Sequence, residues 1–179
     1  MKRNSTVSSS QQESKNNTPH SSFLMSLFNA RCEDAKITIN AHNSGKLLDR
    51  FLKTVQDDST TPDVLNLQGM GVGAKSMRVI HEQLTSRSWY TSLLLSKNQL
   101  DGEAVQHLAR LLNGNRSIVK LDLRATKMSP TAMVTLSNSL KTSKVATLDL
   151  SSMAGFKAND LGILSFFIFF FATENETGY

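Results

Sequence analysis

A glycine-rich segment, residues 69–76 (GMGVGAKS), holds the residues of this 179-residue chain that are best suited to chemistry. It fits the GxGxxA spacing of dinucleotide-binding loops, and it nearly matches a P-loop, except that Ala74 stands before Lys75 where a glycine should be. Such loops bind phosphate through backbone N–H groups at a helix N-terminus. However, residues 96–98 (Ser-Lys-Asn) stand at the next strand end, where a dinucleotide site needs an acidic residue. We therefore interpret the segment as a strand-to-helix turn and expect no nucleotide cofactor.

The other reactive side chains form no pattern that supports catalysis or metal binding. His20 and His42 fall in polar segments, and His81 and His107 fall on different expected helices at unmatched phases. A zinc site needs a cluster of His, Cys or carboxylate ligands, usually at a recognisable spacing. We therefore expect no metal site and no enzyme activity. The lone Cys32 cannot form an internal disulfide, which favours a reducing compartment.

The elements that must position these residues follow from an internal repeat. Short apolar tripeptides recur 28 residues apart, and they are followed by small or apolar residues at steps of four, such as Ala104, Leu108 and Leu112. This switch from a period of two to one near 3.6 predicts a strand and then an amphipathic helix in each unit. The tripeptides are Ile37-Thr38-Ile39, Leu65-Asn66-Leu67, Leu93-Leu94-Leu95, Leu121-Asp122-Leu123 and, 27 residues later, Leu148-Asp149-Leu150.

The third unit carries the motif that identifies the repeat type. Residues 93–100 (LLLSKNQL) fit the pattern LxLxxNxL, and residues 121–128 fit it again with Thr126 in place of asparagine. On these motifs, residues 37–170 resemble the leucine-rich repeat family, in its 28-residue, ribonuclease-inhibitor-like type. The resemblance implies an α/β solenoid of about five units. It would form a short curved arc, with parallel strands on the concave face and helices on the convex face.

The segments outside the repeats differ in amino-acid composition. Residues 1–22 are rich in Ser, Asn and Gln and nearly lack apolar side chains, so we expect a disordered arm. Residues 171–179 are interpreted as a polar tail. Residues 23–36 could form a capping helix over the first unit, because four apolar residues lie there at helical spacing: Phe23, Leu24, Leu27 and Phe28.

Departures from the repeat pattern predict local weakness. Methionine cannot bond the turn backbone as an amide does, so we expect a looser array in the first two units and the last. The last turn, residues 153–155, also contains a one-residue insertion. The position that takes Asn in the family holds, in chain order, His42, Met70, Asn98, Thr126 and Met153.

Two aromatic features have open explanations. Five phenylalanines in residues 166–171 make the last expected helix apolar on all sides, which is unlike a terminal repeat. We expect that end to dock on further repeats, a partner or lipid. The apolar run is only about 12 residues long, and a spanning helix needs about 20, so a membrane-spanning segment is not expected. Trp89 is interpreted either as a covered loop residue or as an exposed anchor for a partner.

The residues that flank the strand leucines form the candidate binding site. Side chains alternate along a strand, so these residues must face away from the helices. A leucine exposed among polar and charged groups suits a protein-binding surface. The candidate partner-binding residues are Asn66, Gln68, Leu94, Ser96, Lys97, Lys120, Asp122, Arg124, Asp149 and Ser151.

These observations favour a non-catalytic interaction module that binds a protein partner on its concave face, with a cytoplasmic location. The formal net charge of +5 is spread along the chain without a basic stripe, so we expect no nucleic-acid partner. Two alternatives stay open. The activators of the Ran GTPase share the repeat type, although they carry an acidic C-terminal segment that this chain lacks. The chain could also be a fragment of a longer leucine-rich repeat regulatory protein.

Overall fold

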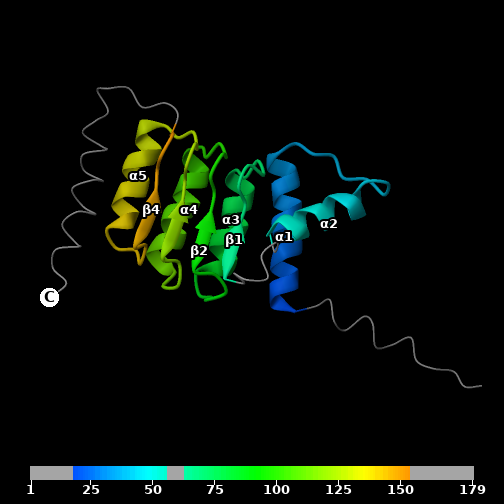
Figure 1. The fold of residues 1–179 in the computed structure, drawn as a ribbon, viewed down its shortest axis with the longest axis horizontal. Helices are drawn as coiled ribbons and strands as arrows, with labels where there is room; N and C mark the ends of the chain where they lie inside the picture. Colours follow the sequence, from blue (N-terminus) through cyan, green and yellow to red (C-terminus); the bar gives the residue numbers. More distant parts are fainter. Residues whose placement is uncertain (1–17, 56–62, 154–179) are drawn as a thin grey trace, which may run out of the picture.

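Four short parallel strands form the sheet of the computed structural model, which describes residues 18–55 and 63–153. The strands lie side by side in chain order (Figure 1). They are β1 (Val64–Asn66), β2 (Ser92–Leu94), β3 (Lys120–Asp122) and β4 (Thr147–Asp149). Three helices form a second layer on one side of the sheet: α3 (Ala74–Leu84), α4 (Gly102–Gly114) and α5 (Pro130–Leu140).

The pairing of the strands reproduces the spacing of the repeat. Leu65 lies opposite Leu93, which lies opposite Leu121, and Leu121 lies opposite Leu148 after the shorter step. The first three of these leucines are completely buried, so they form one row through the core. The predicted α/β fold with a parallel sheet is therefore confirmed. The curved solenoid and the ribonuclease-inhibitor-like repeat type stay predictions.

Two helices of the second layer, α4 and α5, begin at residues whose side chains cap them. The Asp101 carboxylate accepts a hydrogen bond from the Ala104 N–H at 2.8 Å, and the Ser129 hydroxyl accepts one from the Ala132 N–H at 3.2 Å. Such caps satisfy N–H groups that have no partner within the helix. Each helix then buries one stripe against the sheet, with completely buried residues that include Ile80, Leu108 and Leu136.

Helix α1 (Pro19–Asp34) covers the first end of this array and runs antiparallel to α3. Its first turn reaches the segment after α3, where His20 Nε2 lies 2.8 Å from the Tyr90 hydroxyl. Its last residue, Asp34, lies at the N-terminus of α3. The apolar residues expected in a capping helix are buried in the shared core: Phe23, Leu24, Leu27 and Phe28.

The start of α1 corrects the predicted extent of the polar arm. Residues 19–22 belong to the helix, although they were assigned to the arm of residues 1–22. Thr18 is the N-cap, since its hydroxyl accepts a hydrogen bond from the Ser21 N–H at 3.2 Å, and Pro19 occupies the first helical position. A threonine followed by proline is a start signal that outweighs the polar composition of these residues. Residues 1–17 lie outside the described residues.

The first predicted strand, Ile37-Thr38-Ile39, is absent from the sheet. Lys36 turns the chain with a φ of 55°, and the Asn43 amide donates to the Thr38 carbonyl at 2.9 Å. Asn40 accepts hydrogen bonds from the backbone N–H groups of residues 42 and 43. These side-chain bonds compete with a strand ladder. The described residues therefore hold four strands where the repeat predicts five.

Helix α2 (Ser44–Val55) follows this turn and lies across the α1 end of the array (Figure 1). Phe51 and Val55 are buried and anchor it to the core. The phenylalanine cluster in residues 166–171, the tail and residues 154–155 of the last turn lie outside the described residues.

Asn98 joins two neighbouring turns and is 4% exposed. Its side-chain oxygen accepts hydrogen bonds from the N–H groups of Gly71 and Val72, at 2.9 and 3.0 Å. Its amide nitrogen donates to the carbonyls of Leu67 and Leu95, both at 2.9 Å. In the next unit Thr126 makes one such bond, to the Leu123 carbonyl. The asparagine therefore satisfies backbone groups of both units, whereas the threonine satisfies one.

Asn115 has a similar role at the other edge of the array, and the sequence reasoning missed it. It is 3% exposed, and its amide nitrogen donates to the carbonyls of Leu84 and Arg87. Its oxygen accepts from the N–H groups of Ser117 and Ile118. No other unit has an asparagine at this position, so the repeat pattern gave no signal for it.

We expect Asn98→Ala to lower the free energy of unfolding by about 2–4 kcal/mol, because several buried backbone groups lose their partner. Thr126→Val keeps the shape and removes one bond, so its loss should be about 1 kcal/mol. Urea unfolding followed by circular dichroism measures both. Equal losses in the two variants would show that Asn98 does not join the turns as described.

Candidate functional site

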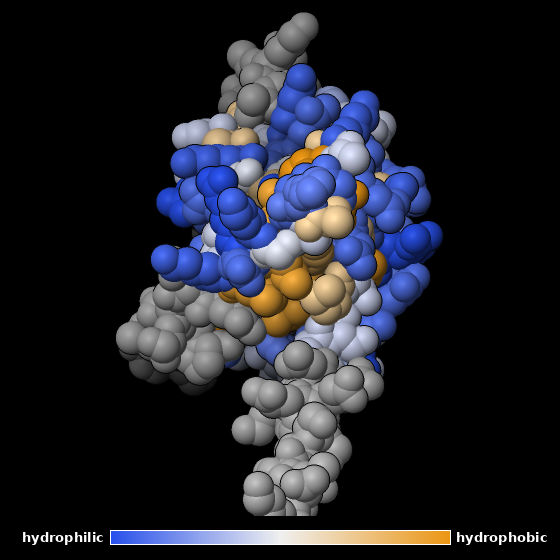
Figure 2. Space-filling model, turned by 90° about the vertical axis from the view of Figure 1, so that its right-hand side faces the viewer, coloured by the Kyte–Doolittle hydropathy of each residue, from blue (hydrophilic) through white to orange (hydrophobic). Residues whose placement is uncertain are grey.

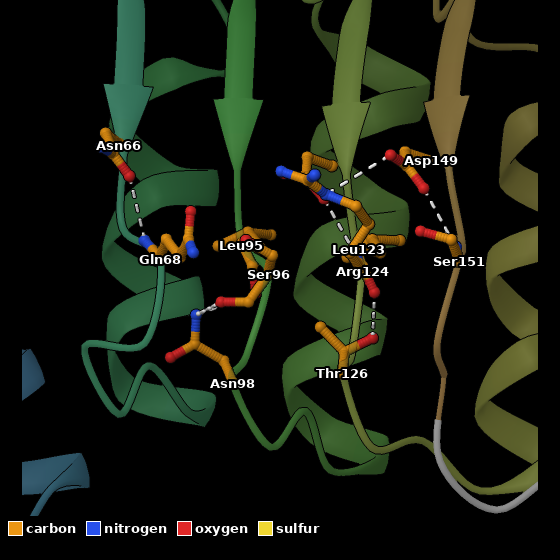
Figure 3. Close-up of polar contacts among 11 residues, drawn as sticks. Asn66, Gln68, Leu95, Ser96, Asn98, Leu123, Arg124, Thr126, Asp149 and Ser151 are labelled. Carbon is orange, nitrogen blue, oxygen red and sulfur yellow. Dashed lines mark hydrogen bonds and ion pairs between the residues drawn. The ribbon is translucent and has the colours of Figure 1, made fainter.

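The predicted binding residues lie on the side of the sheet opposite α3, α4 and α5, which Figure 3 views directly. We call this side the open face. It consists of three rows: Val64, Ser92, Lys120 and Thr147; Asn66, Leu94, Asp122 and Asp149; Gln68, Ser96, Arg124 and Ser151. Sequence reasoning missed Val64, Ser92 and Thr147, which precede each tripeptide's first leucine and alternate in the same way. Lys97 lies in the turn after β2.

The structure corrects two of the ten predicted residues. Asp122 is 3% exposed and Ser96 is 1% exposed, so neither presents its side chain to a partner. The other eight are accessible to some degree. Lys97, Lys120, Arg124 and Ser151 are exposed, and Asn66, Gln68, Leu94 and Asp149 are half-buried.

Asp122 is buried because Arg124 covers it. Arg124 Nη2 lies 2.8 Å from Asp122 Oδ2 and Arg124 Nε lies 3.0 Å from Oδ1, and Nε also lies 3.4 Å from Asp149 Oδ2 (Figure 3). Burial opposes ionisation of Asp122, but the hydrogen bonds and charge of Arg124 outweigh it and hold the pKa of Asp122 below its ordinary value. The Ser96 hydroxyl forms no hydrogen bond of good geometry, but it lies close enough to Asp122 to contribute to the lowering of that pKa. Arg124, Asp122 and Asp149 thus pair with one another.

In each of the last four tripeptides the middle residue is the last residue of its strand. The side-chain oxygens of Asn66, Asp122 and Asp149 each accept a hydrogen bond from the backbone N–H two residues later, at 3.2, 2.9 and 3.0 Å. These hydrogen bonds to the backbone therefore explain why the three positions carry polar residues. Leu94 occupies the same position in β2 and cannot make this bond. It is half-buried and stands where the neighbouring strands carry Asn or Asp.

Two lysines lie near Leu94. Lys120 is on the adjacent strand of the same face, two residues before the partner of Leu94, and Lys97 follows β2. Both are exposed, and within residues 18–55 and 63–153 neither forms an ion pair. The open face therefore combines an accessible leucine with the unpaired charge of Lys120, and the unpaired charge of Lys97 lies in the adjoining turn.

The glycine-rich turn, residues 69–76, already holds an anionic group from the chain itself. The Asp34 carboxylate accepts hydrogen bonds from the N–H groups of Gly73, Lys75 and Ser76 at 2.9, 3.1 and 2.8 Å, and from the Ser76 hydroxyl at 2.6 Å. These are the donors that a phosphate would need.

Two of the three glycines of this turn, Gly71 and Gly73, are explained by the same contact with the end of α1. A Cβ at Gly71 would lie 3.1 Å from the Ala35 Cβ, and one at Gly73 would lie 3.0 Å from the Asp34 side chain. Gly71 also has a φ of 73°, which glycine adopts without strain. The resemblance to a nucleotide loop therefore follows from close packing of the turn against the end of α1.

His81 and His107 lie close together although their phases in the repeat are unmatched. Their ring centroids are 5.7 Å apart, between α3 and α4. His107 is buried, and Nδ1 of each ring has no hydrogen-bond partner in the described part of the chain. Burial, and then the nearby His107 and Arg110, lower the pKa of His81. No group of three His, Cys, Asp or Glu residues that could hold a metal ion occurs among the described residues.

Trp89 is half-buried and packs against α1, with its ring centroid 5.8 Å from that of Phe23 and 5.1 Å from that of His20. The Arg87 guanidinium lies 4.8 Å from its centroid. This favours the interpretation of Trp89 as a covered residue that holds α1 in place.

Comparisons with known proteins bear on the fold. No protein-family model matches the sequence, and no curated protein matches it. Among solved structures, the chain is similar to one described as leiomodin-1 actin-binding site 2 (ABS2). The two share a TM-score of 0.51 and 16% sequence identity, over 87% of this chain and 89% of that chain. The likeness concerns the fold and supports a leucine-rich-repeat-like arrangement.

None of the helices within residues 18–55 and 63–153 is both long and apolar enough to cross a membrane.

Asp34→Ala should destabilise the protein more than Asp101→Ala does. Asp34 accepts four hydrogen bonds at the start of α3, whereas the cap at Asp101 accepts one at the start of α4. We expect a loss of about 2 kcal/mol for the first variant and about 1 kcal/mol for the second, measured by urea unfolding. A smaller loss at Asp34 than at Asp101 would contradict this assignment.

The histidine pair predicts a loss of stability in mild acid. Because the pKa of His81 is lowered in the folded protein, the unfolded chain binds the proton more readily. The contribution of the neutral His81 to the free energy of unfolding is complete above about pH 6.5, the ordinary pKa of histidine. It is lost as the pH falls below that value. Thermal unfolding from pH 8 to pH 5 should show a smaller drop for His81→Gln than for the wild type. His42→Gln, in an exposed turn, is the control, and an equal effect there would refute the prediction.

Proposed function

We propose that this protein is a non-catalytic, leucine-rich-repeat-like scaffold that binds a protein partner on its open face. The observation that carries the proposal is Leu94. Its neighbours in the row use Asn or Asp to end their strands, and Leu94 gives up that bond to present an apolar side chain. Departures from a local sequence pattern of this kind are expected at functional positions.

The surroundings of Leu94 suit a partner with acidic and apolar groups. Lys97 and Lys120 offer positive charge without internal partners among the described residues, and they would attract carboxylates at the rim of the contact. Arg124 is held by Asp122 and Asp149, so it would dock as a fixed group. The sheet is formed before binding, so little ordering is needed.

The variant Leu94→Asn tests this proposal with little risk to the fold, because Asn is the residue that β1 carries at the same position. We expect it to lose the proteins that the wild-type chain captures from a lysate of its source cells, by at least about tenfold in quantitative mass spectrometry. Val134→Asn is the matched control, since Val134 is 48% exposed on α5, in the helix layer. Retention of all partners by Leu94→Asn, or equal loss in the control, would remove the open face from the proposal.

Actin is a second candidate partner, favoured by the fold likeness to leiomodin-1 actin-binding site 2. Sedimentation of the purified chain with filamentous actin, and fluorescence titration with monomeric actin, test it directly. Absence of binding in both assays would exclude actin and leave the open-face proposal intact. Regulation of a small GTPase, membership of a longer repeat protein and a cytoplasmic location stay predictions.

A further inference from the structure

A pocket lies at the α1–α2 end of the molecule, apart from the centre of the open face. Its volume is about 360 Å³, and it is enclosed by the last turns of α1, by α2 and by the turn after β1. Its lining includes Arg31, Ile37, Leu47, Arg50, Phe51 and Met70.

The apolar side of this pocket comes partly from α2, which contributes Leu47 and Phe51. This helix has apolar residues along one face, but only Phe51 and Val55 of that face are buried. Leu47, Leu48 and Leu52 are half-buried. Figure 2 views the molecule from this end and shows apolar side chains gathered at its centre with hydrophilic ones around them. An apolar area with a polar rim is typical of an interaction surface.

The charged side of the pocket is positive. Arg31 is half-buried, and its Nε donates to the Met70 carbonyl at 2.7 Å, which fixes the guanidinium at the wall. Arg50 is exposed on α2 and also lines the pocket. Among the described residues, no Asp or Glu lines the pocket and neither arginine forms an ion pair. A fixed guanidinium with free Nη groups is suited to a carboxylate.

From this geometry we infer that the pocket binds an acidic segment of a protein partner, one that inserts a large apolar side chain and places a neighbouring carboxylate on Arg31 and Arg50. The apolar side chain would pack against Ile37, Leu47 and Phe51. The pocket adjoins the open face at Gln68, which belongs to its lining, but Leu94 and Lys120 do not line it. The inference therefore goes beyond the proposed function.

A protein segment fits these observations better than a lipid surface does. A helix that lies on a membrane turns its whole apolar face towards the acyl chains. Here α2 directs Phe51 and Val55 into the core and leaves a hollow beside them. A hollow accepts a protruding side chain, whereas a bilayer needs a convex apolar surface.

Fluorescence anisotropy with the full chain and labelled peptides tests the inference. The peptide EDLFEELD is expected to bind, whereas EDSSEESD, which lacks the apolar residues, and KKLFKKLK, which reverses the charge, are expected to bind at least about tenfold more weakly. Arg50→Glu should weaken EDLFEELD binding at least about tenfold, and Leu47→Gln should weaken it too. Lys53→Glu makes the same charge change on an exposed residue of α2 outside the pocket, and it should leave the affinity unchanged.

The other outcomes overturn the inference in distinguishable ways. Equal loss in Arg50→Glu and Lys53→Glu would show non-specific attraction by a basic helix. Loss in Lys120→Glu with no change in Arg50→Glu would place the peptide on the open face, which contradicts the pocket and leaves the proposed function standing. Vesicles of phosphatidylcholine and phosphatidylserine that bind the chain while no peptide does would indicate a lipid site. Failure of EDLFEELD to bind at all also refutes the pocket. Thermal unfolding of every variant confirms that the fold is retained.

Discussion

The structure depends on one constraint: a strand–helix unit of about 28 residues cannot bury its apolar face without a neighbour on each side. The row of leucines at positions 65, 93, 121 and 148 satisfies this constraint between units. Before β1 the described residues form no further strand–helix unit of this sheet, so α1 takes the place of a neighbour and buries Phe23 and Leu27. The cap is antiparallel to the helix layer and therefore needs special contacts at both of its ends.

Those contacts account for features that look chemical in the sequence. At one end of α1, His20, Trp89 and Tyr90 pack together, and burial raises the pKa of Tyr90 to about 12. At the other end, the Asp34 carboxylate occupies the N-terminus of α3, and the glycines beside it allow close approach. A loop that resembles a phosphate site thus binds the carboxylate of the capping helix. The surface residues that neither cap the array nor hold its units together are therefore the candidates for function.

The repeat spacing predicts the sheet and its register, because these follow from contacts at a constant offset along the chain. The family resemblance predicts that Asn98 bonds the turn backbone, but that it joins two neighbouring turns is seen only in the structure. The spacing could not show that the first predicted strand, residues 37–39, is absent from the sheet. Ile37 and Ile39 satisfy the repeat pattern, but the side-chain hydrogen bonds of Asn40 and Asn43 override it. The burial of Asp122 and the roles of Asp34 and Asn115 depend on partners at irregular separations. Alternation along a strand gives the side of the sheet on which a residue lies, but it does not show whether a neighbour covers that residue.

The central claim is that the open face, with Leu94 at its centre, is where a partner binds. Hydrogen–deuterium exchange of the chain with and without its captured partner measures this directly. We expect slower exchange in residues 92–98 and 120–124 on binding, with α3, α4 and α5 unchanged. Slower exchange confined to the helix layer, with residues 92–98 unaffected, would contradict it.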